Sequence, residues 1–256
     1  MLWTTSVTGF LCLGAALAGH APPVAVTAAG LAVHALVATL GVLLPGLSVF
    51  GDVLGRGPRD RREIALTFDD GPHPETTRRV LAVLAAARVR ATFFVLGAKA
   101  ERHADVVREI VAAGHEVGLH GHTHDALYAL RSSARLAADL AAARAAVERA
   151  CGVRAVLFRP PVGFVSHTVA LAAERAGLTL VGFTARTRDG VASADSAAVL
   201  ARATRALENG AIIVLHDAAE RDDRVPASLA VLPELCAEIA RRGLTAVTLT
   251  DLRRER

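Results

Sequence analysis

Charged side chains are missing from the first fifth of the chain. No Asp, Glu, Lys or Arg precedes Asp52 in the 256 residues. After Asp52, charged and apolar residues mix in ordinary proportions, and about 200 residues are enough to bury a substantial core. The sequence therefore predicts an apolar membrane segment at residues 1–50, a basic linker at 51–62 and one main domain at 63–252.

Cysteine and aromatic residues are also scarce. Cys12, Cys151 and Cys236 form no C-x-x-C pair, and they do not decide the redox compartment. Aromatic residues make up 4% of the chain, and the net charge is +4. Because the arginines are spread over amphipathic segments without interleaved aromatics or a nucleic-acid motif, no nucleic-acid partner is expected.

Two apolar stretches fill the uncharged segment, at residues 2–19 and 24–44. Each is close to the ~20 residues that cross a bilayer as a helix. Pro22 and Pro23 between them favour an extended, tight connection, so the sequence predicts a transmembrane helical hairpin. One alternative is a signal peptide cleaved after the Ala-Leu-Ala sequence at 16–18, although the usual basic start is missing. Another is a hairpin buried in a soluble protein.

Four arginines follow this segment, namely Arg56, Arg59, Arg61 and Arg62. The positive-inside tendency predicts that such a cluster stays on the cytoplasmic side of the cell membrane. A plainer interpretation is contact between the arginines and anionic membrane lipid.

The main domain alternates short β-type runs with segments of helical period. Strands are predicted at 64–68, 91–95, 116–119, 156–158, 180–183, 211–215 and 245–249, and helices at 76–87, 100–113, 133–150, 166–176, 193–208 and 227–242. Such an α/β repeat buries parallel strands beneath helices, in a closed barrel or a doubly wound sheet. In both architectures, functional groups gather at the C-terminal ends of the strands.

Polar residues do follow the predicted strands. They are Asp69 and Asp70, His120 and His124, Arg159, Asp189, and His216 with Asp217. Adjacent side chains on a strand point to opposite faces, so both aspartates can face one site only if the chain bends at Asp70-Gly71-Pro72. Two carboxylates this close also require a nearby cation to remain ionised together.

The sequence His-Gly-His-Thr-His at residues 120–124 supplies candidate metal ligands. On a helical turn, His120 and His124 would sit side by side and could bind one ion. One carboxylate, from Asp69 or Asp70, would complete a two-histidine, one-carboxylate site with open positions. His122 would point away and have a packing role. A solvated histidine-rich loop is the alternative.

Four motifs in order resemble those of carbohydrate esterase family 4, the polysaccharide deacetylases. They are Thr-Phe-Asp-Asp-Gly-Pro at 67–72, the spaced histidines within 118–124, Arg-Pro-Pro at 159–161 and Leu-His at 215–216. The resemblance covers residues 63–252 and implies a distorted (β/α)7-type barrel, preceded here by the predicted hairpin.

The resemblance also implies roles for individual residues. Asp70, His120 and His124 are expected to bind a divalent metal ion, zinc or alternatively cobalt; Asp69 to act as base beside Arg159; His216 to act as acid supported by Asp189; and Pro161, Val162 and Leu215 to contact substrate or the oxyanion. A metal ion would activate water and polarise an acyl carbonyl.

Some positions depart from the family pattern. Gly121 replaces a usual Ser or Thr, and Val162 stands where Tyr is common. Phe183 and Gly190 occupy places where Trp is frequent, and Arg186 replaces a common Asp. The first two changes leave the expected chemistry intact, whereas the last three alter the predicted glycan-binding surface.

The predicted function is therefore a metal-dependent hydrolase that removes N-acetyl or another small N-acyl group from an amino-sugar glycan or glycolipid. A domain on the cytoplasmic face would meet a lipid-linked sugar rather than finished wall polymer. One alternative is a catalytically weakened, membrane-tethered glycan-binding protein of the same fold. Another is a non-haem iron oxygenase, which uses the same ligand set.

Overall fold

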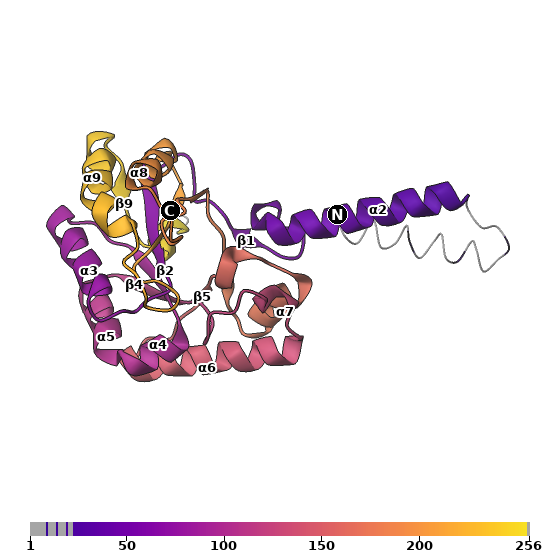
Figure 1. Ribbon diagram of the computed structural model, residues 1–256, viewed down its shortest axis with the longest axis horizontal. Coiled ribbons are helices and arrows are strands. Elements are labelled where there is room, and N and C mark those ends of the chain that lie inside the picture. The colour runs from indigo at the N-terminus through magenta and orange to yellow at the C-terminus, as the bar shows by residue number, and fades with distance from the viewer. Residues whose placement is uncertain (1–8, 10–13, 15–18, 20–22, 255–256) are drawn as a thin grey trace.

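The computed structural model describes residues 9, 14, 19 and 23–254 (Figure 1). The strands are β1 (Val53–Leu54), β2 (Glu63–Asp69), β3 (Thr92–Val95), β4 (Glu116–Leu119), β5 (Leu157–Phe158), β6 (Thr179–Val181), β7 (Ala185–Arg186), β8 (Ile212–His216) and β9 (Thr245–Ala246). The α-helices are α2 (Val24–Leu43), α3 (Thr76–Ala87), α4 (Gly97–Arg102), α5 (Ala104–Ala112), α6 (Ser133–Cys151), α7 (His167–Arg175), α8 (Ser196–Arg205), α9 (Ser228–Arg241) and α10 (Leu249–Leu252). Short 3-10 turns are η1 (Pro45–Leu47), η2 (Tyr128–Leu130) and η3 (Pro161–Gly163).

The strands form one parallel sheet that curls without closing. Its order is β1-β6-β5-β4-β3-β2-β8-β7, with β9 beside the start of β2. Only residues 182–184 separate β6, near one edge, from β7 at the other, so the two edges must lie close. The predicted α/β repeat is confirmed as a half-barrel of parallel strands, with the labelled helices α3 to α9 around it (Figure 1).

The strand β2 lies at the centre of this arrangement. Six of its seven residues are buried, because parallel strands covered by helices need apolar side chains on both faces. Phe68 of β2 stacks on Phe93 of β3 with ring centroids 5.0 Å apart. The neighbouring β8 pairs Asp69 directly with His216. The core therefore fixes two predicted site residues in one register.

Several predicted boundaries differ from those observed. The predicted strand 180–183 ends at Val181 as β6, because the chain then crosses to the other edge of the sheet, where β7 begins at Ala185. The predicted helix 100–113 breaks at His103 into α4 and α5. The predicted helix 193–208 starts only at Ser196, where the Asp195 carboxylate accepts a hydrogen bond from the Ala198 N–H at 2.9 Å and caps the helix.

One helix among the described residues is long and apolar enough to cross a bilayer. This helix, α2, has a mean hydropathy of 2.0 over an 18-residue stretch, of which 6% is buried. It matches the predicted span at 24–44, and its length and composition fit a membrane span or a signal sequence. The other predicted stretch, 2–19, falls outside the described residues except at 9, 14 and 19, so the hairpin is not shown.

The end of α2 and the segment after it are attached to the main domain. The Val42 carbonyl accepts a hydrogen bond from the Val165 N–H at 3.3 Å. The stretch expected to be a linker contributes β1, which pairs with β6. Two of its arginines also bind carbonyls of the domain: Arg62 Nε lies 3.0 Å from the Gly243 oxygen, and Arg61 donates to another carbonyl. These arginines therefore have structural partners as well as charge.

Candidate active site

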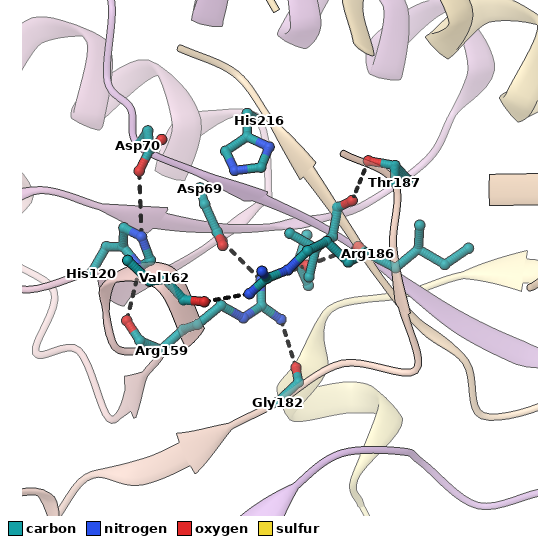
Figure 2. A network of polar contacts seen from close by, with 12 residues as sticks. Asp69, Asp70, His120, Arg159, Val162, Gly182, Arg186, Thr187 and His216 are labelled. Atoms are coloured by element: carbon teal, nitrogen blue, oxygen red, sulfur yellow. Dashed lines mark hydrogen bonds and ion pairs between the residues drawn. The ribbon is translucent and has the colours of Figure 1, made fainter. Parts of the chain in front are cut away.

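Two carboxylates leave the C-terminal end of β2. Asp69 is the last residue of the strand, and Asp70 follows in the left-handed region with a φ of 74°. This change in backbone direction breaks the alternation of side chains, so the expected bend is present. Figure 2 shows both carboxylates among the polar side chains of the site, with Asp70 toward His120 and Asp69 toward Arg159.

A buried carboxylate underlies the bend. A Cβ at Gly71 would lie 2.1 Å from Oδ2 of Asp217, so only glycine fits there. The same oxygen accepts a hydrogen bond from the Thr77 hydroxyl at 2.5 Å. Burial raises the pKa of Asp217 to about 7. Asp217 stands next to His216 after a predicted strand, but nothing in the sequence pattern predicts this supporting role.

The three predicted metal ligands, Asp70, His120 and His124, lie close together. Donor atoms of Asp70, His120 and His124 all lie within 4.8 Å of one another. Oδ1 of Asp70 is 3.3 Å from Nε2 of His120 and 3.7 Å from Nε2 of His124. That oxygen is buried and has no hydrogen-bond partner among the described residues. A carboxylate oxygen and two imidazole nitrogens facing one point fit a divalent metal ion.

The electrostatics of Asp70 agree with this fit. Burial raises the pKa of Asp70, but the close contact with His120 and the charges of His120, His216 and His124 outweigh burial and hold that pKa well below its usual range. The carboxylate is therefore ionised, as a ligand must be.

The two histidines do not lie on a helical turn, and that expectation was wrong. Residues 120–124 form an irregular loop after β4, with Gly121 at a φ of 85°. The loop is held from α6, because Asp139 Oδ2 accepts from the His122 N–H and the Tyr128 hydroxyl, each at 2.9 Å. Asp139 thus supports the loop that carries both histidines, and no spacing in the sequence predicted this role.

Asp69 pairs with Arg159 away from the candidate ligands. Arg159 Nη1 lies 2.8 Å from Oδ1 of Asp69 and 2.8 Å from the Thr67 hydroxyl. Its Nη2 donates to the Gly182 carbonyl at 2.9 Å, and its guanidinium lies over the Phe94 ring. Arg159 is 1% exposed and Asp69 is 4% exposed. The pair is a fixed, desolvated carboxylate with its counter-charge, and Asp69 keeps its second oxygen for another partner.

A second pair joins His216 to Asp189. Nδ1 of His216 lies 2.8 Å from Oδ1 of Asp189, which also accepts from the Thr187 hydroxyl at 2.6 Å. The other Asp189 oxygen accepts from the His216 backbone N–H at 2.8 Å. Burial lowers the pKa of His216, but Asp189 outweighs burial and raises it to about 10. His216 therefore holds a proton at neutral pH, with Nε2 as its free donor.

The rim of the site carries the predicted substrate contacts. Val162 sits in η3 at a φ of 62°, which is strained for a β-branched residue, and its carbonyl accepts from Arg186 (Figure 2). Arg186 also lies over the Phe183 ring at 5.0 Å. Pro161 is buried beside Val162, and the Leu215 side chain is fully buried in the core cluster.

Comparison with known proteins identifies the family. The family profile described as polysaccharide deacetylase matches residues 56–181. A peptidoglycan-N-acetylglucosamine deacetylase of Bacillus cereus is 33% identical over 208 residues, which are 80% of this chain and 94% of the relative. The chain belongs to the polysaccharide deacetylase family. A chitooligosaccharide deacetylase of Rhizobium leguminosarum bv. trifolii is 38% identical over 192 residues, covering 69% of this chain and 86% of that protein.

Solved structures of the polysaccharide deacetylase family agree with the fold. The family 4 acetyl xylan esterase of Clostridium thermocellum, in complex with a cobalt ion, matches with a TM-score of 0.66 and 30% identity. The match covers 74% of this chain and 89% of that one. The chain is thus a carbohydrate deacetylase by family, with a curled α/β barrel of the expected type.

The glycine at position 190 of the rim has a specific geometric reason. A Cβ at Gly190 would lie 3.1 Å from ring atoms of His216. A tryptophan there would require the imidazole or the loop to shift. The glycine therefore allows the observed position of the His216 ring. The surface above the imidazole lacks the large side chain expected at this place.

Proposed function

We propose that this polysaccharide deacetylase is a metal-dependent hydrolase that removes N-acetyl groups from an amino-sugar glycan. The observation that carries the proposal is that two charged pairs, Asp69 with Arg159 and His216 with Asp189, lie next to one group of metal-ligand atoms. Asp69 with Arg159 and His216 with Asp189 are joined by direct register between β2 and β8. Hydrolysis of an amide needs one group to take a proton and another to give one.

A divalent ion held by Asp70, His120 and His124, zinc or cobalt, would lower the pKa of water and polarise the acyl carbonyl. Asp69 takes the proton of the attacking water. The guanidinium of Arg159 holds the Asp69 carboxylate in place at 2.8 Å and compensates its charge. Because that carboxylate is desolvated, its position is determined by the protein rather than by solvent.

His216 gives a proton to the departing amine. Asp189 keeps the imidazole protonated and oriented through its contact with Nδ1, so Nε2 is the donor. The backbone N–H of Val162 supports charge on the acyl oxygen, since η3 lies at the rim beside Asp69 and Arg159 (Figure 2). Arg186 holds this turn through the Val162 carbonyl.

The test is acyl release by purified protein. With zinc or cobalt present, we expect acetate to be released from a chitooligosaccharide or from peptidoglycan, and a chelator to abolish that release. Full release after complete metal removal would contradict the metal dependence. Binding of metal without deacylation of any amino sugar in a broad panel would contradict the function.

The two alternatives leave parts of the site without purpose. A glycan-binding protein has no use for an imidazolium held at a raised pKa beside a buried carboxylate. An iron oxygenase has no use for the Asp69 and His216 pairs. Equal glycan binding and equal inactivity of the wild type and Asp69→Asn would favour the first alternative. Turnover that requires oxygen and a reductant would favour the second.

A lipid-linked amino sugar is a second candidate substrate. It is favoured by α2, whose exposed apolar surface ends at a direct contact between Val42 and Val165, close in sequence to η3. If α2 spans a membrane, this contact holds the rim of the site near the bilayer. A reporter fused after Arg256 that is active only outside the cell would exclude a cytoplasmic precursor and leave wall glycan as the substrate.

A further inference from the structure

The loop after β8 brings a carboxylate to the back of a candidate metal ligand. Glu220 in this loop places Oε2 3.4 Å from Nδ1 of His124. The His124 side chain is 13% exposed and the Glu220 side chain 46% exposed. Nδ1 of His124 is buried without a hydrogen-bond partner among the residues described. The Glu220 carboxylate is therefore positioned to satisfy it after a small approach.

His120 shows what the opposite nitrogen of a ligand histidine does in this site. Its Nε2 faces Asp70, and its Nδ1 lies 2.8 Å from the Arg159 carbonyl, which can only accept a hydrogen bond. Histidines that bind metals commonly donate the second ring N–H to a carbonyl or carboxylate, which fixes the tautomer and the ring orientation. His124 has the same orientation toward Asp70, with Glu220 in place of the carbonyl.

The Glu220 loop is anchored by an unusual residue of this chain. Lys99 is the only lysine in a sequence whose Lys and Arg together number 29. Its side chain is 4% exposed, and Nζ donates to the Ala219 carbonyl at 2.7 Å and to Oδ1 of Asp222 at 2.5 Å. These two contacts flank Glu220 on both sides. The Lys99 ammonium on α4 thus holds the segment that carries the carboxylate, and Arg102 of the same helix lies 3.8 Å from the other oxygen of Asp222.

We propose that Glu220 is a positioning residue of the metal site, and that Lys99 holds it in place. Glu220 accepts the Nδ1 proton of His124, which leaves Nε2 unprotonated and directed at the ion. This inference rests on the metal site of the proposed function and adds residues outside its ligand set. The expected consequence is tighter metal binding, because the second histidine is oriented before the ion arrives.

Metal affinity tests the role of Glu220 directly. We expect Glu220→Gln and Glu220→Ala to raise the zinc dissociation constant by about 10-fold or more, measured by competition with a chromophoric chelator at fixed pH. Asp223→Asn is the matched control, since Asp223 lies in the same loop and contacts the exposed Arg224. The control should bind zinc as the wild type does. Wild-type affinity in both Glu220 variants would overturn the proposal.

A double-mutant cycle tests whether Lys99 acts through Glu220. Lys99→Met alone should weaken zinc binding, but should add little to Glu220→Ala, because the loop then has no carboxylate to position. Asp222→Asn loosens the same anchor without burying an apolar group and should weaken zinc binding in the same direction. Fully additive losses, or unchanged affinity in Lys99→Met and Asp222→Asn, would overturn the role of Lys99.

The outcomes separate this inference from the proposed function. Weaker zinc binding in the Glu220 variants, together with a wild type that deacylates no sugar, would support the inference and contradict the function. An active wild type whose Glu220 variants bind zinc normally would do the reverse. A wild type that binds no divalent metal stoichiometrically would overturn both.

Discussion

The floor and the rim of the site are built differently. On the floor, Asp69, Arg159 and Asp189 are each nearly inaccessible to solvent. Arg159 and Asp189 each make three polar contacts, and one of those of Arg159 holds Asp69. On the rim, Val162 and Arg186 are partly or fully exposed, and they hold each other by one contact. We therefore expect the reaction chemistry to depend on groups that the core fixes, and the choice of substrate to depend on loops that can change without disturbing the core.

The largest effect should come from removing the base. Asp69→Asn should lower kcat by about 10³-fold, since an amide cannot take the proton of water. Zinc stoichiometry should be unchanged, because Asp69 pairs with Arg159 and is not among the grouped ligand atoms. The comparison variant is Asp70→Asn, which should lose zinc affinity itself. A wild-type kcat in Asp69→Asn would show that this part of the floor is not catalytic.

A smaller but pH-dependent loss should follow Asp189→Asn. Asp189 holds the pKa of His216 at about 10, so the wild-type acid stays protonated and kcat falls only as the pH rises through that value. Without Asp189, only the charges of Asp70 and Asp69 oppose burial, so the pKa of His216 falls. Less of the imidazole is then protonated at alkaline pH, which predicts a loss of kcat that grows as the pH rises and reaches about 10-fold or more. The measurement is kcat from pH 5 to 10.5 in both proteins. If kcat of Asp189→Asn falls at the same alkaline pH as kcat of the wild type, the prediction is contradicted.

The pH dependence of the free energy of unfolding should reveal the buried carboxylate of Asp217. The folded-state pKa of Asp217 is raised to about 7, so the folded protein binds its proton more tightly than the unfolded chain. That contribution to stability is present at low pH and is lost as the pH rises from about 4 to 7. Asp217→Asn has no proton to lose and should gain on the wild type across this range, on the order of 1–3 kcal/mol. Urea unfolding at pH 4.5 and 8 measures the difference, and parallel curves would contradict the prediction.

The sequence located the floor well because its residues obey local rules. Asp69, Asp70, His120, Arg159 and His216 follow strands whose apolar character is readable, and parallel strands present their C-terminal ends together. The sequence did not predict that the barrel would stay open as a half-barrel. Closure depends on whether two distant edges pair, and no local pattern encodes it.

The supporting residues escaped prediction for a related reason. Asp139, Asp217 and Glu220 act through contacts with residues far away in the chain, namely Tyr128, Thr77 and His124. An acidic residue on a helix or loop looks the same in sequence whether it faces solvent or a buried N–H. The irregular path of residues 120–124 was missed likewise, because the spacing of two histidines is equally compatible with a helical turn.

The smallest effect should come from the rim, at Arg186. Its guanidinium donates to the Val162 carbonyl and lies over Phe183, so Arg186→Ala frees a turn whose φ of 62° a valine does not favour. Loss of one hydrogen bond predicts a fall in kcat/KM of about 3–10-fold, with zinc affinity unchanged. Arg188→Ala removes an exposed positive charge two residues away and serves as the matched control, with wild-type kinetics expected. An equal loss in both variants would assign the effect to charge rather than to the turn, and a loss as large as that of Asp69→Asn would remove the distinction between rim and floor.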